Sequence, residues 1–346
     1  MPHAKESRQQ VLDHWVNTHV QARYPGANLQ IAPASADASF RRYFRLTLPD
    51  GSTRILMDAP PEREDCRPFV QVAALFAEAG LCVPQVEIAD LEQGFLLLSD
   101  LGRVGYLAAL QAAPELADTL MRPVLDVLVR WQMASRPNVL PPYDETLLRR
   151  EMNLFPEWYI GRHLGHTLTP AQQKTLDAVF TLLSDAALAQ AEVFVHRDFM
   201  PRNLMVVESE ATLTPGVLDF QDAVYGPITY DVVSLFRDAF ISWEEEQELD
   251  WVVRYWEQAR DAGLPVPADF GQFWQDYEWM GLQRHLKVLG IFCRLNYRDG
   301  KAHYLADLPR FLAYARKTAG RYAALKPLLA LLDALEEKPA AAGYTF

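Results

Sequence analysis

The chain has 346 residues, half of them hydrophobic, with 33 Lys and Arg against 45 Asp and Glu, which gives a formal net charge of −12. This length and apolar fraction suffice for two lobes with sizeable cores, whereas the negative charge argues against a nucleic-acid partner. The first ten residues are polar, and no apolar run approaches membrane-spanning length, so neither a signal peptide nor a membrane partner is expected.

The first hundred residues are predicted to be rich in β-structure. Phe44, Leu46 and Leu48 alternate with polar residues, which is the pattern of a strand with one buried face. A turn at 49–51 then leads into a second extended segment. We expect strands at 29–33, 40–48, 54–58, 85–89 and 95–98, and one helix at 67–79 that ends at Gly80.

Beyond residue 105, helical periodicity dominates. Leu120, Val124, Leu128 and Trp131 form an apolar stripe that predicts a helix over 116–134. Further helices are expected around 144–164, 170–190, 243–262, 267–294 and 309–335, and strands only at 204–207 and 217–220. The order of elements indicates an α+β fold with two lobes. These are a β-rich N-terminal lobe at 1–98, a hinge at 99–105 and a mostly helical C-terminal lobe at 106–346.

The cysteines give a weak indication of location. Cys66, Cys82 and Cys293 stand far apart and include no Cys-x-x-Cys pair. They are typical of buried thiols in a reducing compartment rather than of disulfides or metal ligands. Together with the polar N-terminus, this favours a cytoplasmic protein.

The most informative segment is the run 195–205, which reads Val-His-Arg-Asp-Phe-Met-Pro-Arg-Asn-Leu-Met and is followed by Leu218-Asp219-Phe220. Phosphoryl transfer needs a carboxylate that accepts the proton of the attacking hydroxyl, and oxygen ligands for Mg²⁺. Asp198, Asn203 and Asp219 supply these groups in kinase order and spacing. We therefore expect Asp198 to be the base, with Asn203 and Asp219 as metal ligands. The structural alternative is a capped turn between two strands.

These residues resemble the aminoglycoside phosphotransferase superfamily of small-molecule kinases, relatives of choline kinase and of protein kinases. The similarity extends over nearly the whole chain. It implies a protein-kinase-like fold, a nucleotide-binding N-terminal lobe, ATP and Mg²⁺ as cofactors, and an adenine-binding hinge at Leu98, Ser99 and Asp100.

Several segments are similar to a bacterial cell-wall-recycling branch of this superfamily, which phosphorylates the anomeric hydroxyl of N-acetylmuramic acid and N-acetylglucosamine. That branch resemblance implies a small-molecule amino sugar and a nucleotide as ligands, and no obligate protein partner is inferred. The segments are 40–44, 57–61, 95–102, 157–164 and 282–292.

The chain departs from the kinase pattern at the phosphate site. Kinases usually carry a strand Lys on the ATP phosphates, paired with a helix Glu, but Met57 stands at about the Lys position and the helix has no Glu in its place. The phosphate loop at 34–39 lacks glycine and offers the small residues Ser35 and Ser39 instead. We expect at least one arginine just after this loop to replace the Lys, because a guanidinium can clamp phosphate. The candidates are Arg41, Arg42 and Arg45; the alternative is that all three are solvent-facing.

Four residues near the motif are interpreted as structural support. His196 is expected to pack near the metal loop, and Arg197 to pair with a nearby carboxylate. Asp222 could approach the metal or the acceptor, or cap a turn. Asp231 could be a helix N-cap, while the family resemblance favours a brace for the catalytic loop.

The acceptor site is expected in the helical lobe, where carboxylates and amides would hold sugar hydroxyls beside an aromatic ring. Glu151, Trp158 and Tyr159 offer such groups on one predicted helix. Arg284, or else Arg162, could meet the lactyl carboxylate of N-acetylmuramate; Gln283 and His285 offer further polar groups. Burial in the core, or a solvated helix face, is the alternative for each.

Two other functions stay open at this point. A kinase of the same superfamily could act on an aminoglycoside or amino alcohol, which the acidic composition permits. The missing Lys and Glu would also suit a nucleotide-binding pseudokinase that serves as a scaffold. Retention of the base and both metal ligands argues against that second alternative.

Overall fold

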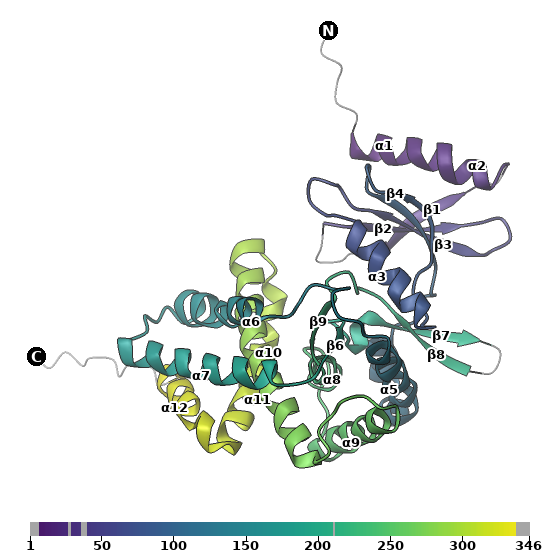
Figure 1. The fold of residues 1–346 in the computed structure, drawn as a ribbon. Coiled ribbons are helices and arrows are strands. Elements are labelled where there is room, and N and C mark those ends of the chain that lie inside the picture. The colour runs from purple at the N-terminus through teal and green to yellow at the C-terminus, as the bar shows by residue number, and fades with distance from the viewer. Residues whose placement is uncertain (1–6, 27–28, 36–39, 210–211, 337–346) are drawn as a thin grey trace, which may run out of the picture. The chain divides into compact units, whose positions relative to one another are not determined.

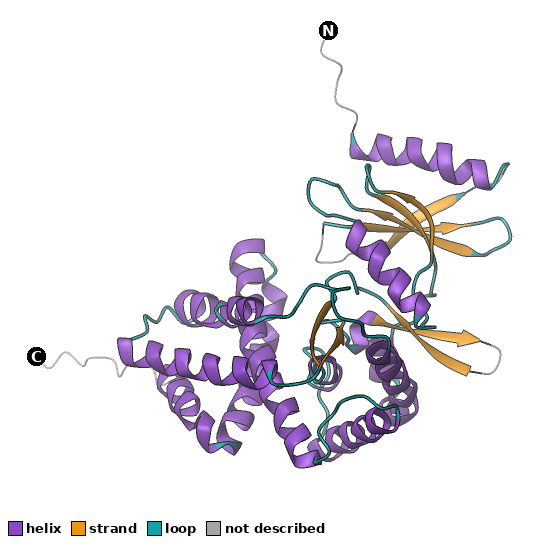
Figure 2. Cartoon of the chain, in the orientation of Figure 1, coloured by secondary structure: helices purple, strands orange, loops and turns teal. Residues whose placement is uncertain are grey.

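The computed structural model describes residues 7–26, 29–35, 40–209 and 212–336. The chain forms two compact units (Figures 1 and 2). Unit 1 comprises residues 1–134 and 202–223, and unit 2 comprises residues 135–201 and 224–346. The lobe boundaries expected at 98 and 105 stay a prediction.

Unit 1 is built on a five-stranded antiparallel sheet with the strand order β1-β2-β3-β5-β4. The five strands predicted from the first hundred residues are all present, within about two residues at most ends. They are β1 (Gln30–Ser35), β2 (Arg42–Thr47), β3 (Thr53–Asp58), β4 (Val86–Asp90) and β5 (Phe95–Ser99).

One face of this sheet is covered by an N-terminal helical segment that the sequence analysis missed (Figure 1). The segment consists of α1 (Arg8–Trp15), the π-helical η1 (Val16–Val20) and α2 (Gln21–Arg23). Its Leu12 and Trp15 pack with Leu46, Leu56 and other apolar residues of the sheet. Neighbouring strand residues point to opposite faces, so Tyr43, Arg45 and Ile55 lie on the other face of the sheet.

The remaining elements of unit 1 pack around aromatic contacts. Phe76 of α3 stacks on Trp131 of α5 with ring centroids 3.7 Å apart, and Phe220 lies against Phe69 and Phe76. These contacts hold the segment after β8 against α3. The elements are α3 (Arg67–Glu78), α4 (Tyr106–Ala112), η2 (Pro114–Leu116), α5 (Ala117–Met133), η4 (Pro201–Asn203), β7 (Leu204–Ser209) and β8 (Thr212–Val217).

Unit 2 is mostly helical, as predicted, but two predicted helices are interrupted. The helix expected at 144–164 divides into α6 and a π-helix, and the one at 309–335 breaks near Tyr322. The elements are α6 (Glu145–Met152), η3 (Phe155–His163), α7 (Pro170–Leu188), β6 (Glu192–Val195), β9 (Val224–Pro227), α8 (Tyr230–Phe236), α9 (Glu245–Asp261), α10 (Phe270–Asp299), η5 (Ala302–Asp307), α11 (Leu308–Arg321), η6 (Ala323–Leu325) and α12 (Lys326–Glu336).

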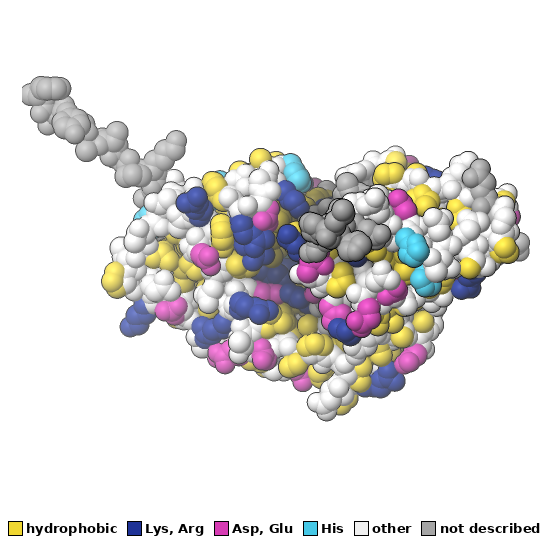
Figure 3. Space-filling view, turned by 90° about the horizontal axis from the view of Figure 1, so that it is seen from above, with side chains coloured by type: hydrophobic (Ala, Val, Ile, Leu, Met, Phe, Trp, Pro, Cys, Tyr) yellow, Lys and Arg dark blue, Asp and Glu magenta, His cyan; other side chains and the backbone are white. Residues whose placement is uncertain are grey.

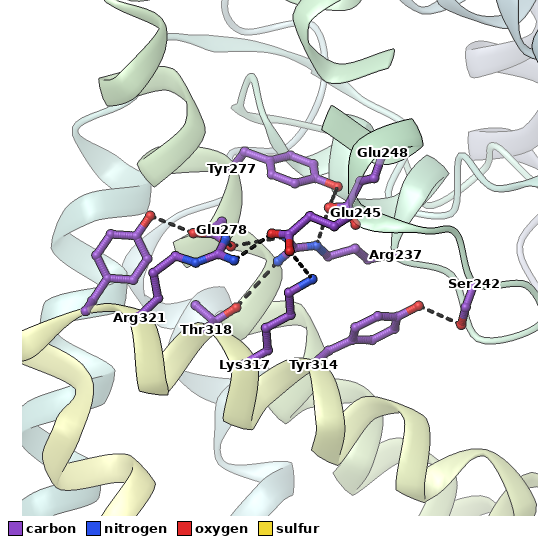
Figure 4. A network of polar contacts seen from close by, with 11 residues as sticks. Arg237, Ser242, Glu245, Glu248, Tyr277, Glu278, Tyr314, Lys317, Thr318 and Arg321 are labelled. Atoms are coloured by element: carbon purple, nitrogen blue, oxygen red, sulfur yellow. Dashed lines mark hydrogen bonds and ion pairs between the residues drawn. The ribbon is translucent and has the colours of Figure 1, made fainter. Parts of the chain in front are cut away.

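Charged side chains join three helices of unit 2 (Figure 4). Arg237, which follows α8, donates to Glu248 of α9 at 2.7 Å and to Glu278 of α10 at 3.2 Å. Arg321 of α11 donates to the same Glu278 and to Glu245, each at 2.5 Å. Buried ion pairs gain little net stability, because desolvation opposes their attraction. Their geometry nevertheless fixes how the three helices meet.

The surface mixes both signs of charge. On the face seen in Figure 3, Lys and Arg side chains lie among Asp and Glu side chains, with hydrophobic ones between them. In the part of the chain that the structure describes, no helix combines the length and apolar character needed to cross a membrane.

Candidate active site

A cavity of about 540 Å³ lies within unit 1, on the sheet face opposite the N-terminal helical segment. Its volume is typical of a small-molecule site. Its apolar lining suits a flat ring, and its charged lining suits a ligand that also carries ionised groups. The apolar lining residues are Ala34, Ile55, Phe69, Pro84, Leu98, Leu101, Met205 and Leu218. The others are Tyr43, Arg45, Ser99, Asp100, Gly102, Arg103, Arg202, Asn203 and Asp219.

The three predicted hinge residues, Leu98, Ser99 and Asp100, all line this cavity. Arg45 holds their segment in place. Its Nε donates to Asp100 Oδ2 at 2.5 Å, and its Nη2 donates to the carbonyl oxygen of Gly102 at 2.6 Å. Burial would raise the pKa of Asp100, but hydrogen bonds from its donors, Arg45 first among them, outweigh burial and lower it. Arg45 therefore braces the cavity wall as an ion pair.

Asn203 and Asp219, the predicted metal ligands, lie side by side in the same cavity. Asn203 Nδ2 is 3.4 Å from Asp219 Oδ2, and Gln221 Nε2 donates to Asp219 Oδ1 at 3.0 Å. The strand predicted at 217–220 was wrong in its extent, since β8 ends at Val217. Asp219 has a φ of 61°, a conformation that strands do not contain and that is uncommon outside glycine. The turn directs its carboxylate into the cavity.

These two side chains fit a Mg²⁺ ion, which prefers carboxylate and amide oxygens and keeps positions for phosphate oxygens and water. Among the described residues, no group of three or more His, Cys, Asp or Glu side chains is placed to hold a metal ion. A magnesium ion shared with nucleotide phosphates does not need such a group, because one or two carboxylates are usual there.

The three arginines after the phosphate loop have different surroundings. Arg42 lies in register with Asp58, to which its Nε donates at 2.8 Å, and Arg8 of α1 binds the same buried carboxylate. Arg42 thus shares the sheet face of Phe44 and Leu46, which the N-terminal helical segment covers. Its contacts do not support the expected role in nucleotide binding.

Arg41 lies close to one of the predicted metal ligands, Asp219. Its Nη2 is 3.2 Å from Glu64 Oε2, and its Nη1 is 4.0 Å from Asp219 Oδ1. Ser35 is the last residue of β1, and Ser39 lies outside the described residues. The phosphate-binding role of Ser35, Ser39 and the loop between them therefore stays a prediction.

The predicted base, Asp198, stands on a loop of unit 2 that Asp231 braces. The buried Asp231 carboxylate accepts the backbone N–H of His196 at 2.7 Å and that of Arg197 at 2.9 Å. Asp231 is not the N-cap of α8, a position held by Thr229, so the capping hypothesis was wrong. Burial raises the pKa of Asp231 to about 7, although the two amide donors lower it. The geometry matches the bracing alternative.

Arg197 is anchored by a buried carboxylate, as expected for a support residue. Its Nη2 lies 2.5 Å from Glu151 Oε1, and Lys287 Nζ lies 2.9 Å from the same oxygen. The Tyr143 hydroxyl donates to the other oxygen of Glu151. Burial would raise the pKa of Glu151, but the charges of Lys287 and Arg197 outweigh it and lower the pKa to about 2. Glu151 is thus fully engaged by protein groups, and its contacts do not support the expected role as a sugar ligand.

The other acceptor candidates differ in their burial. Tyr159 is buried between Phe155 and His163, and Trp158 beside it is half-buried. Arg284 is buried on α10, and its charge lowers the pKa values of Asp231 and Asp238, both of which burial raises.

Two further predicted residues are exposed, and one buried residue was not predicted from the sequence. Asp222 is exposed, and its Oδ2 is 3.5 Å from Gln221 Nε2. Arg162 is exposed, 5.7 Å from the Tyr297 ring. The sequence analysis missed Lys287, although a lone Lys within the apolar run 286–292 could have indicated a buried partner.

A five-stranded antiparallel sheet with a cavity, the predicted metal ligands in that cavity and a braced loop that carries the predicted base are typical of a kinase-like phosphotransferase. Residues 30–270 match the phosphotransferase enzyme family, and the chain belongs to that family. It is 50% identical to the N-acetylmuramate/N-acetylglucosamine kinase of Neisseria meningitidis serogroup B over 342 residues, which cover 98% of this chain and 99% of that protein.

Solved structures show the same fold at low identity. An ethanolamine kinase from Plasmodium vivax aligns with a TM-score of 0.62 at 9% identity, over 91% of each chain. An ADP-bound aminoglycoside phosphotransferase aligns with a TM-score of 0.56 at 13% identity, over 88% of this chain and 99% of its own. The predicted kinase-like fold is thereby confirmed.

Proposed function

We propose that this chain is an ATP- and Mg²⁺-dependent kinase that phosphorylates the anomeric hydroxyl of N-acetylmuramate and N-acetylglucosamine, as in peptidoglycan recycling. The observation that carries the proposal is its 50% identity to the Neisseria kinase over nearly the full length of both chains. Asp198, Asn203 and Asp219 supply the groups that phosphoryl transfer needs.

The nucleotide is assigned to the cavity of unit 1. The apolar side chains of Ile55, Leu98 and Leu218 would contact the adenine ring, next to the segment that Arg45 braces. Asn203 and Asp219 would hold Mg²⁺, which neutralises phosphate charge when bound. Ile55 and Leu98 belong to the predicted nucleotide-binding lobe at 1–98 and Asp100 to the predicted hinge at 99–105, whereas Asn203, Leu218 and Asp219 come from a later part of unit 1. An ATP-dependent enzyme with free cysteines also fits a cytoplasmic location.

Asp198 is assigned the role of the base that accepts the proton of the attacking sugar hydroxyl. The hydroxyl oxygen forms a bond to the γ-phosphorus as the bond to the bridging oxygen of ADP breaks, and the proton passes to the Asp198 carboxylate. Asp231 holds the amides of His196 and Arg197, which fixes the backbone just before the base. Such positioning is the main contribution that a protein makes to phosphoryl transfer.

An acceptor panel tests the proposal. Purified protein with ATP and Mg²⁺ is offered N-acetylmuramate, N-acetylglucosamine, kanamycin, ethanolamine and choline, and ADP release is measured. We expect turnover with the two amino sugars at a kcat/KM at least about a hundredfold above the others, since a site built for specific hydroxyls discriminates strongly. A preference for kanamycin or an amino alcohol would show that the amino sugars are not the acceptors of this kinase. Nucleotide binding without turnover of any acceptor would indicate a pseudokinase.

A further inference from the structure

The proposed nucleotide site has no lysine at the strand position where kinases usually carry one. Met57 stands where a strand Lys is expected, and its side chain is fully buried. The acidic residue of α3 is Glu78, at the C-terminal end of the helix, so this helix offers no Glu near its start. A kinase site without the Lys–Glu pair needs another source of positive charge for the phosphates.

Arg41 has the position and the contacts to be that source. It directly precedes β2 and lies two residues before Tyr43, which lines the cavity and is the cross-strand partner of Met57. Arg41 hydrogen-bonds Tyr43, and its Nη1 lies 4.0 Å from Asp219 Oδ1. The guanidinium therefore adjoins two residues of the cavity wall, one of them a predicted metal ligand.

Glu64 holds Arg41 from the side of the β3–α3 loop. Glu64 Oε2 accepts from Arg41 Nη2 at 3.2 Å, and the Arg41 side chain is only 9% exposed. A guanidinium carries five N–H donors, so it can contact Glu64, Tyr43 and a further acceptor at the same time. A divalent cation on Asp219 would repel Arg41 from that carboxylate, while Glu64 would still retain it beside the cavity.

The neighbouring arginines, Arg42 and Arg45, form ion pairs with other carboxylates. Arg45 is bound to Asp100 and to the Gly102 carbonyl oxygen, and Arg42 is bound to Asp58 on the other face of the sheet. Arg42 therefore provides a matched control, since it neighbours Arg41 in the sequence and is also ion-paired.

We propose that Arg41 is the phosphate-binding cation of this site and that Glu64 positions it, so that the Arg41–Glu64 pair takes the place of the strand Lys and helix Glu of other kinases. The inference rests on the proposed function, because it requires a nucleotide in the cavity of unit 1. Arg41 would contact phosphate oxygens, and Glu64 would act through Arg41.

Nucleotide affinities test the pair without relying on turnover. Calorimetric titrations with AMP and with the non-hydrolysable ATP analogue AMP-PNP, both with Mg²⁺, are compared for the wild type, Arg41→Met and Arg42→Met. Loss of a charge-assisted contact should weaken AMP-PNP binding about tenfold to a hundredfold in Arg41→Met, with AMP affinity within about twofold of wild type. Arg42→Met should leave both affinities within about twofold.

The positioning role of Glu64 is tested by whether its effect on AMP-PNP affinity requires Arg41. Glu64→Gln should weaken AMP-PNP binding about threefold to tenfold in the wild-type background and leave it unchanged in the Arg41→Met background, because coupled residues are non-additive. A merely structural Glu64 would weaken binding equally in both backgrounds. If Arg41→Met does not fold, Arg41→Lys is used in its place. This variant keeps the positive charge but loses the forked guanidinium. Its affinities for AMP and AMP-PNP are compared with those of the wild type in the same way.

Equal AMP-PNP affinities of the wild type and the Arg41 variants would overturn the proposed pair and leave the proposed function standing. Failure of the wild type to bind any adenine nucleotide would overturn both.

Discussion

Arg197 Nη2 lies 2.5 Å from Glu151 Oε1, although the two residues are 46 positions apart in the sequence. Arg197 also has a φ of 76°, a left-handed conformation that costs energy for a residue with a Cβ. The buried carboxylate thus holds the residue directly before the predicted base in a strained backbone. This ion pair therefore links α6 to the loop that carries the predicted base.

The first prediction concerns the base. Asp198→Asn should lower kcat with N-acetylglucosamine by about 10²–10⁴-fold, because Asn cannot accept the hydroxyl proton. The AMP-PNP affinity should stay within about twofold of wild type. Steady-state kinetics and calorimetry measure the two quantities. Asp185→Asn, at an exposed position of α7, is the control and should change neither. A near-normal kcat in Asp198→Asn would remove the base assignment.

The second prediction concerns acid stability. Glu151 has a folded-state pKa of about 2, below its ordinary value of 4.5. A depressed carboxyl pKa contributes stability above pH 4.5 that is lost as pH falls toward 2, at most roughly 3 kcal/mol. The free energy of unfolding of wild type should therefore exceed that of Glu151→Gln most above pH 5, and the difference should narrow toward pH 2. Urea denaturation followed by tryptophan fluorescence measures it; a constant difference between pH 6 and 3 would contradict the ion pairing.

The third prediction compares a buried and an exposed lysine. Lys287→Met removes a cation from the buried Glu151 and the donor of a 2.9 Å hydrogen bond to the Tyr230 hydroxyl. Breaking such a pair should cost about 3–5 kcal/mol of unfolding free energy. Lys317 pairs with Glu245 at 3.1 Å but is 40% exposed (Figure 4), so Lys317→Met should cost less than about 1 kcal/mol. Equal costs in chemical denaturation would show that Lys287 is solvated.

The fourth prediction compares two glycines of α10. A Cβ at Gly290 would lie 2.3 Å from the carbonyl carbon of Leu154, whereas a Cβ at Gly281 would find its nearest neighbours at 3.5 Å. Gly290→Ala should therefore push α10 away from the segment before η3. The substitution should lower the free energy of unfolding by about 1–3 kcal/mol or more. Gly281→Ala should be neutral or stabilise by up to about 1 kcal/mol, because Ala favours a helix. Similar thermal midpoints for both variants would contradict this packing.

Sequence periodicity predicted most elements but missed the helical segment that covers the sheet. The alternation of Phe44, Leu46 and Leu48 indicated a buried face, and a buried face needs a covering element. Leu12, Trp15 and Val16 could have supplied it, with Ser7 and Gln10 as a capping box at the start of α1. The same alternation places Arg42 with Phe44, away from Arg41 and Arg45, so its exclusion from the nucleotide site was within reach of the sequence.

The supports of the catalytic loop were harder to predict. Asp231 and Glu151 reach residues 34 and 46 positions away, and nothing in the local pattern specifies such partners. Near Asp231 the apolar residues indicated a helix, for which an N-cap was the simplest interpretation. Only tertiary packing brought that carboxylate to the amides of His196 and Arg197. The motif residues were predictable because their chemistry prescribes their spacing.

The position of the phosphate on the product tests the central claim most directly. N-acetylglucosamine labelled with ¹³C at carbon 1 is incubated with ATP, Mg²⁺ and the enzyme, and the product is examined by ¹³C and ³¹P NMR. The account predicts a new phosphomonoester whose phosphorus couples to the labelled carbon, and its absence with Asp198→Asn. A phosphate on any other carbon, or no phosphorylated sugar from the wild-type enzyme, would contradict it.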